Sequence, residues 1–332
     1  MNGGLKKMKN NYLLLDILVL FSLTIYSQGN YGDEQSGSYA DSLFKVGERY
    51  FLENNLYEAK EIFTKLLYQT PENLQTLEYL SQIAIAQQDL SSVKFYNEKI
   101  LILDTDNIDA LISLGVIYFN EHLLSEAEAQ FDKVLNIEPD NESVLYNLGV
   151  LYGTKGEFHK AEITLNHAAQ INPLNSKIYQ TLGLFYLQNQ SYVDAESNLL
   201  KAISIDKNLL EARKGLIILY QNQNKLDQSS KYIKEIETVS ANYPQLNLLI
   251  ANQKFLEGET DSAITYALKE IQEKPDQADA YYFLSTLYGL NGEEIKSNNA
   301  FAKAEKLFIK KKVELSDEPI MMRKSLIDSI TK

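Results

Sequence analysis

The sequence predicts an all-α fold, a solenoid of about eight helix-turn-helix repeats of 34 residues each. Three residue types recur with that period between Ala40 and Lys311, each at its own phase and without insertions. They are glycine (Gly47, Gly115, Gly149, Gly183), alanine (Ala59, Ala127, Ala161, Ala195, Ala263) and proline (Pro71, Pro139, Pro173, Pro275). A fixed period of this size is the signature of stacked supersecondary units, so it decides the architecture.

Each repeat is expected to hold two helices, helix A and helix B. In the third repeat, Leu111, Leu114 and Tyr118 are three and four residues apart, which places them on one face of helix A. Ala127 and Phe131 continue this spacing on helix B. Numbered from 1 to 34, the expected repeats are 40–73, 74–107, 108–141, 142–175, 176–209, 210–243, 244–277 and 278–311. Turn-forming residues stand between the helices at position 15: Asn54, Gly156, Asn224, Gly258 and Gly292.

Small residues are expected to set the distance between the two helices. Glycine or alanine at position 8 and alanine at position 20 allow the backbones to approach closely, while a large apolar residue at position 24 fills the neighbouring space. Proline at position 32 disfavours helix in the residue before it and so ends helix B. A long coiled coil is excluded, because its apolar period would be 7 residues rather than 34.

These residues resemble the tetratricopeptide repeat family. The third and fourth repeats carry the resemblance best, through Leu114, Gly115, Tyr118, Ala127, Phe131 and Pro139, then Leu148, Gly149, Tyr152, Gly156, Ala161, Ala168 and Pro173. The resemblance implies a right-handed α-solenoid that binds proteins. Other repeats depart from the pattern, at Ser81, Ala84, Asn97, Ile217, Ser229 and Lys254. Looser stacking is therefore expected near residues 74–107 and 210–255.

The resemblance also implies a partner-binding groove. In this family, positions 2, 5, 9 and 12 of helix A line the concave surface that receives partner segments. Here those positions hold a run of apolar residues: Ile112, Val116, Phe119, Tyr146, Val150, Leu184, Leu187, Ile218, Leu248, Phe255 and Tyr282. Either this run is an apolar docking strip, or neighbouring helices partly bury it. The family's carboxylate clamp is not expected, because Lys214 is the one base at position 5 and Ile218 follows it instead of Asn.

No residue pattern indicates catalysis. The chain has no cysteine, and His122, His159 and His167 lack the spacing of a metal site. The glycines recur every 34 residues and never cluster as a phosphate-binding loop requires. We therefore expect no enzyme activity, catalytic residue, cofactor, metal site or small-molecule substrate. A formal net charge of −13 disfavours nucleic acid. The family resemblance implies a protein or peptide as the partner.

Both ends of the chain are expected to lie outside the repeats. Lys6, Lys7 and Lys9 precede an apolar run, residues 12–26, in the layout of a secretory signal peptide over residues 1–27. An uncleaved membrane anchor and a cytosolic extension are the alternatives. Residues 28–39 are polar and are expected to form a flexible leader. Residues 312–332, with Pro319 placed to begin a helix, are expected to cap the last repeat.

The leading hypothesis is a non-enzymatic scaffold, exported to the periplasm or secreted, that binds a protein or peptide segment in its groove. The alternative is a structural subunit or assembly factor of a cell-envelope complex, which allows association with a membrane complex. A chain that keeps its N-terminal segment as a membrane anchor is the alternative for its location.

Export gives the first testable prediction. Protein purified from its native host is expected to begin near Gln28, because the basic, apolar and polar order of residues 1–30 suits signal cleavage there. N-terminal sequencing measures this directly. A soluble cytosolic protein that still begins at Met1 or Met8 would contradict the prediction.

Overall fold

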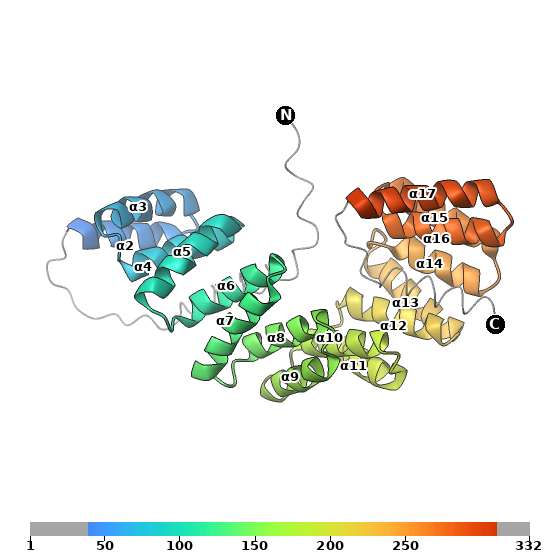
Figure 1. The fold of residues 1–332 in the computed structure, drawn as a ribbon, viewed down its shortest axis with the longest axis horizontal. Helices are drawn as coiled ribbons and strands as arrows, with labels where there is room; N and C mark the ends of the chain where they lie inside the picture. Colours follow the sequence, from blue (N-terminus) through green and yellow to red (C-terminus); the bar gives the residue numbers. More distant parts are fainter. Residues whose placement is uncertain (1–38, 311–332) are drawn as a thin grey trace. The chain divides into compact units, whose positions relative to one another are not determined.

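The computed structural model describes residues 39–310. Three expected segments lie outside this range: the signal peptide, the capping helix, and the leader except for its last residue, Tyr39. All regular structure within it is α-helical, and the sixteen helices follow one another in pairs (Figure 1). They are α2 (Tyr39–Leu52), α3 (Leu56–Gln69), α4 (Leu74–Ala86), α5 (Leu90–Leu103), α6 (Ile108–Asn120), α7 (Leu124–Ile137), α8 (Glu142–Thr154), α9 (Phe158–Ile171), α10 (Ser176–Gln188), α11 (Tyr192–Ile205), α12 (Leu210–Asn222), α13 (Leu226–Val239), α14 (Leu246–Leu256), α15 (Thr260–Glu273), α16 (Ala278–Leu290) and α17 (Glu294–Lys310). The predicted all-α repeat fold is confirmed.

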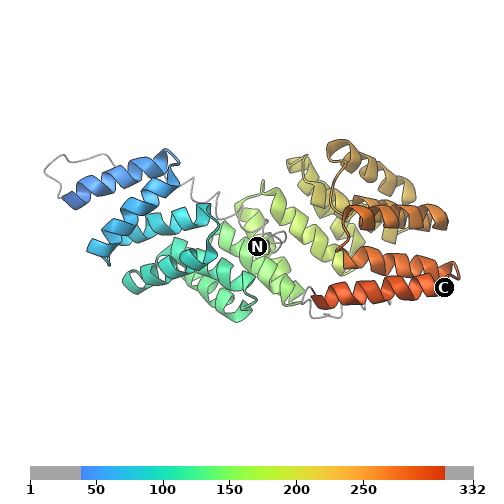
Figure 2. The same cartoon turned by 90° about the horizontal axis from the view of Figure 1, so that it is seen from above.

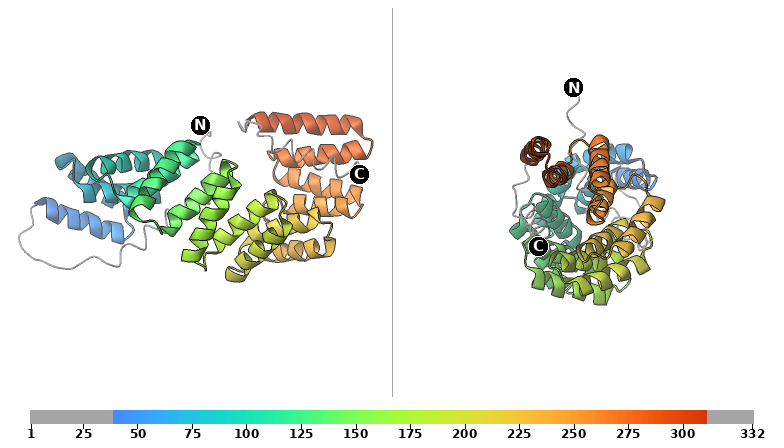
Figure 3. Two further views of the ribbon diagram at one scale, coloured as in Figure 1. Left: turned by 60° about the horizontal axis from the view of Figure 1, so that its bottom comes forward. Right: turned by 90° about the vertical axis from the view of Figure 1, so that its right-hand side faces the viewer.

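The chain divides into two compact bodies, which meet in sequence at Pro173 and Leu174. The N-terminal body contains α2 to α9, and the C-terminal body contains α10 to α17. Within each body, every helix packs against the next one along the chain, as the blue-to-green helices of Figure 2 and the yellow-to-red helices of Figure 3 show. The division falls between the fourth and fifth repeats, and not at 74–107 or 210–255, where looser stacking was expected.

Glycine at position 8 brings helix A against helix B. A Cβ added to Gly115 would lie 2.5 Å from the Phe131 ring, and one added to Gly183 would lie 2.6 Å from Leu199 Cγ. Gly149 faces Leu165 in the same way. Each large residue stands at position 24 of the same repeat, so the predicted alternation of small and large residues describes a real contact. At Gly115, Gly149 and Gly183, no larger side chain fits unless the facing residue moves.

The second repeat replaces this contact with a polar one. Ser81 stands at position 8 and Asn97 at position 24, and both are buried. The Asn97 amide donates hydrogen bonds to Ser81 Oγ and to the Val93 carbonyl, both at 2.9 Å. A buried amide that finds two acceptors avoids most of its desolvation cost. The departure noted in the sequence is therefore a hydrogen-bonded pair in place of the usual small and large apolar residues.

A buried polar network joins the sixth and seventh repeats in the C-terminal body. Gln221 on α12 donates to the Leu249 carbonyl at 3.0 Å, and Asn252 donates to Gln221 Oε1 at 2.8 Å. Gln253 on α14 donates to the Leu226 carbonyl at 3.2 Å. Both glutamines are less than 5% exposed. Buried hydrogen bonds thus contribute to packing between these two repeats, alongside apolar side chains.

Position 15 has the same backbone conformation in all eight repeats. Its φ angle is positive at Asn54, Gln88, His122, Gly156, Gln190, Asn224, Gly258 and Gly292, between 54° and 83°. Glycine adopts this left-handed region freely, and asparagine does so more readily than most residues. Histidine is also enriched in this region, but Gln88 and Gln190 adopt it without such an advantage. The turn is therefore imposed by the packing of the two helices as well as by the turn residue itself.

Asparagine at position 34 starts several of the A helices. The side chains of Asn73, Asn107 and Asn141 accept hydrogen bonds from the backbone N–H groups of Thr76, Ala110 and Val144, respectively, at 2.8 to 3.1 Å. Such a cap satisfies a helix N–H that has no partner within the helix, and it contributes about 1 kcal/mol. Successive helices of the N-terminal body thus begin at a fixed residue of the period.

Substitution of Gly149 tests the helix contact. Gly149→Leu is expected to lower the denaturant midpoint, because the new side chain occupies the space of Leu165, and overpacking of this kind costs about 1–3 kcal/mol. The control is Thr154→Leu, at an exposed position on the same helix, which should change stability by less than about 0.5 kcal/mol. Equal midpoints for the two variants would contradict the assigned contact.

Candidate partner-binding surface

The predicted groove residues of the N-terminal body are more buried than a free surface requires. Ile112 and Val116 on α6 are 4% and 1% exposed, and both belong to the core formed with α5, α7 and α8. Tyr146 on α8 is 7% exposed. For these three residues, burial by neighbouring helices is the better interpretation of the apolar run. Phe119 and Val150 are half-buried and keep some surface.

The predicted groove residues of the C-terminal body are all half-buried. Leu184 on α10 packs over Gly215 on α12, since a Cβ added to that glycine would lie 3.1 Å from Leu184 Cδ2. Phe255 meets Phe283 edge to face at 6.3 Å, and Tyr282 lies 6.2 Å from the Phe301 ring. Leu187, Ile218 and Leu248 complete the set. Leu184 and Phe255 therefore contribute to packing between repeats in addition to any contact with a partner.

The A helices of the N-terminal body also present carboxylates. We call the residues at positions 2, 5, 9 and 12 of α2, α4, α6 and α8 the helix A face of this body. Besides half-buried Phe119 and Val150, it includes Glu48 on α2, Glu78 on α4 and Asp109 on α6. None of its sixteen positions carries lysine or arginine. The sequence analysis missed these acidic residues, although the same 34-residue phase identifies them.

Neutral hydrogen-bond donors hold two of these carboxylates. The Tyr79 hydroxyl donates to Glu48 Oε1 at 2.8 Å, and the Asn107 amide donates to Glu78 Oε1 at 3.1 Å. Tyr79 is fixed in turn by stacking on Phe63, with ring centroids 4.6 Å apart. These donors position the carboxylates on adjacent helices and leave their negative charge uncompensated.

Burial and like charge raise the pKa values of two carboxyl groups on this face. Burial raises the pKa of Glu78; the hydrogen bond from Asn107 opposes this, and Asp109 and Asp104 add repulsion. Partial desolvation raises the pKa of Asp109, and Glu138 adds to the shift. No cation contributes to either shift. The face therefore holds negative charge at a cost, which a bound cationic group would reduce.

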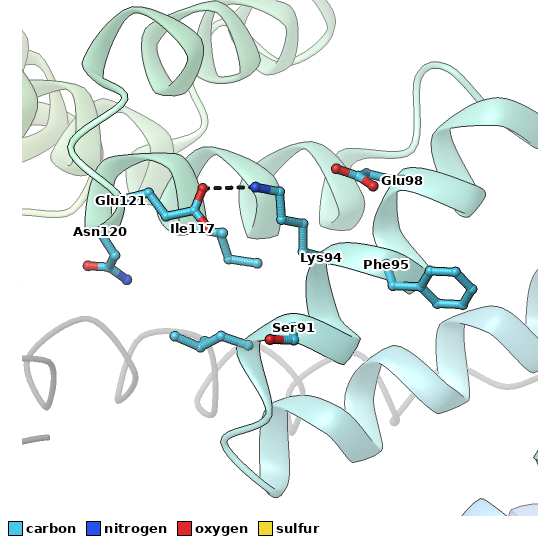
Figure 4. Close-up of a pocket in the computed structure, with 8 residues that line it drawn as sticks. Ser91, Lys94, Phe95, Glu98, Ile117, Asn120 and Glu121 are labelled. Carbon is cyan, nitrogen blue, oxygen red and sulfur yellow. Dashed lines mark hydrogen bonds and ion pairs between the residues drawn. The ribbon is translucent and has the colours of Figure 1, made fainter. Parts of the chain in front are cut away.

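A separate hollow of about 350 Å³ lies where α5 meets the end of α6. Figure 4 shows Lys94 extending to Glu121, with which it forms an ion pair at 2.8 Å, while Phe95 points away from them. Lys94 also lies over the Tyr118 ring, 5.1 Å from its centroid. Because Lys94 is already paired, the hollow offers no free cation to a ligand. It is a junction between the second and third repeats.

The described residues offer neither a metal site nor a membrane-spanning helix. Between residues 39 and 310, His, Asp and Glu side chains do not group in a way that would hold a metal ion. No helix in the same range combines the length and the apolar character that a membrane span requires.

Comparisons with known proteins identify the type of repeat. The family model described as Tetratricopeptide repeat matches residues 142–173 and 176–209. These segments are the fourth and fifth repeats, one on each side of the division between the bodies. No curated protein sequence matches the chain.

Solved structures match much more of the chain, at low sequence identity. A tetratricopeptide repeat protein from Parabacteroides merdae is 22% identical with a TM-score of 0.56, over 82% of this chain and 94% of that one. The type IV pilus biogenesis factor PilW is 15% identical with a TM-score of 0.57, over 65% and 100%. The pilF protein of Pseudomonas aeruginosa is 18% identical with a TM-score of 0.50, over 74% and 97%. At these identities the likeness shows the fold alone.

The raised pKa of Glu78 predicts a pH-dependent effect of its removal. When a carboxyl group has a higher pKa in the folded state than in the unfolded state, the folded state loses stability as the pH rises through the folded-state pKa. Glu78→Gln keeps an acceptor for Asn107. At about pH 7 the substitution should raise the free energy of unfolding by up to about 1 kcal/mol, and the thermal midpoint should rise with it. At about pH 4 both should change little. Glu98→Gln, on exposed α5 surface, is the control. An equal gain at both pH values would contradict the prediction.

Proposed function

Because this chain is a tetratricopeptide repeat protein, we propose that it is a non-enzymatic scaffold that binds a segment of another protein on the helix A face of its N-terminal body. The observation that supports this proposal best is the pairing of apolar and acidic side chains on that face. Phe119 and Val150 remain half-buried between helices, while Glu48, Glu78 and Asp109 accompany them. Peptide grooves use apolar anchors for affinity and polar groups for register.

Export belongs to the same proposal. Lys6, Lys7 and Lys9 followed by an apolar run support a secretory signal, and a partner would then be met in the periplasm or outside the cell. Retention of the segment as a membrane anchor would place the scaffold at the membrane surface instead.

A second candidate is an assembly factor of a cell-envelope complex. One observation favours it: a solved structure with this fold, covered over its whole length, is a type IV pilus biogenesis factor. A factor of this kind would contact its complex through helix B surfaces or the ends of the repeat array as well as through the helix A face.

Site-specific crosslinking in the native host separates these functions. A photoreactive residue at Phe119 or Val150 is expected to capture one segment of one partner, because both side chains lie on the helix A face. The control is Ala129, which is exposed on helix α7. Mass spectrometry of the crosslinked peptides identifies the segment.

Capture of the same segment from Ala129 would contradict binding at the helix A face. Capture from Ala129 alone would favour the second candidate. Each variant must first show a helical content and a thermal midpoint close to those of the unmodified protein.

A further inference from the structure

The negative charge of this protein is concentrated in its N-terminal body. Residues 39–173 contain 9 lysines and arginines against 21 aspartates and glutamates, a formal net charge of −12. Residues 174–310 contain 15 against 17, a net charge of −2. The two bodies have the same fold and similar length. Acidity that served only solubility would not need to be confined to one of them.

The few bases of the N-terminal body do not neutralise the helix A face. Lys65, Lys94 and Lys155 form ion pairs at 2.7 to 2.8 Å, with Glu61, Glu121 and Glu128, respectively. Each of these pairs includes a residue of a B helix. Glu48, Glu78 and Asp109 have no ion pair with a lysine or arginine within 4.0 Å among the described residues. The face that carries the half-buried apolar side chains therefore holds uncompensated negative charge.

The equivalent positions of the C-terminal body differ. Lys177 stands at position 2 of α10 and Lys214 at position 5 of α12, where Lys214 pairs with Glu211 at 3.7 Å. Glu211 and Asp279 are the acidic residues at positions 2, 5, 9 and 12 of that body. These four positions are thus balanced in charge in the C-terminal body, so the imbalance at the same positions of the N-terminal body is a local feature and not a property of the repeat.

We propose that the partner of this face is a basic protein segment in which lysine or arginine alternates with apolar residues. The basic side chains reach Glu48, Glu78 and Asp109, and the apolar ones cover Phe119 and Val150. This inference rests on the proposed function and specifies the chemistry of the partner. Complementary charge of this kind accelerates encounter and selects among partners more than it raises affinity, so binding should weaken with salt.

Three labelled dodecapeptides test the inference with the full chain. They share leucine and alanine positions and carry lysine, glutamine or glutamate at the remaining ones. By fluorescence anisotropy at low salt, the lysine peptide is expected to bind about tenfold more tightly than the glutamine peptide, a difference of about 1.4 kcal/mol. The glutamate peptide should bind more weakly still. Physiological salt should reduce the difference.

A matched pair of triple variants localises the effect. Glu48→Gln, Glu78→Gln and Asp109→Asn together should weaken binding of the lysine peptide about tenfold. The control triple is Glu58→Gln, Glu98→Gln and Glu126→Gln, on exposed surface of α3, α5 and α7. It changes the net charge equally and should alter binding less than about twofold. Helical content and thermal midpoint are measured for both.

Several results would overturn the inference. Equal binding of the lysine and glutamine peptides by the unmodified chain would do so without reference to any variant. Equal weakening by both triples would assign the effect to net charge and not to the face. A concentration-dependent dimer that the face triple abolishes would identify a second copy, with its Lys303 and Lys306, as the occupant in place of a separate partner.

The crosslinking result keeps this inference distinct from the proposed function. If Val150 captures a partner segment without basic residues, and the face triple does not change that capture, the scaffold function stands and the partner chemistry is wrong. If Val150 captures nothing and none of the peptides binds, the proposed function itself fails.

Discussion

The close contact between position 8 and position 24 is the constraint on which the rest of the fold depends. Gly115 and Gly183 allow a phenylalanine or a leucine of helix B to lie where their own side chains would be. The distance between the helices of a pair follows from this contact, and the direction in which the next pair packs follows from that distance. The turn at position 15 and the asparagine cap at position 34 then connect helices whose separation is already determined.

The sequence predicted the helix pairs well because each of their determinants is local. The phases of glycine, alanine and proline lie within one repeat, and the left-handed turn at Asn54, Gly156 or Asn224 needs no distant residue. The division of the chain at Pro173 and Leu174 was not predicted. It depends on contacts between neighbouring repeats, and both of the repeats concerned match the family pattern.

The candidate surface is harder to predict than the fold, for a physical reason. Position in the period assigns a residue to a helix face, but it does not say how closely the next helix covers that face. Ile112 and Val116 have the phase of surface residues and the burial of core residues. The carboxylates of Glu48, Glu78 and Asp109 share that phase, but the net charge of the whole chain does not reveal at which positions of the repeat its acidic residues lie.

The hydrogen-bonded pair of Ser81 and Asn97 has a consequence for how the chain folds. Near-identical helices in one chain can pair wrongly, since an A helix of one repeat resembles that of another. Against a helix that carries glycine at position 8, Asn97 would lose the Ser81 hydroxyl and bury part of its amide without an acceptor. That mismatch disfavours the A helices with glycine at position 8 as partners for α5. One polar pair thus gives the second repeat an identity that the apolar contacts of its neighbours lack.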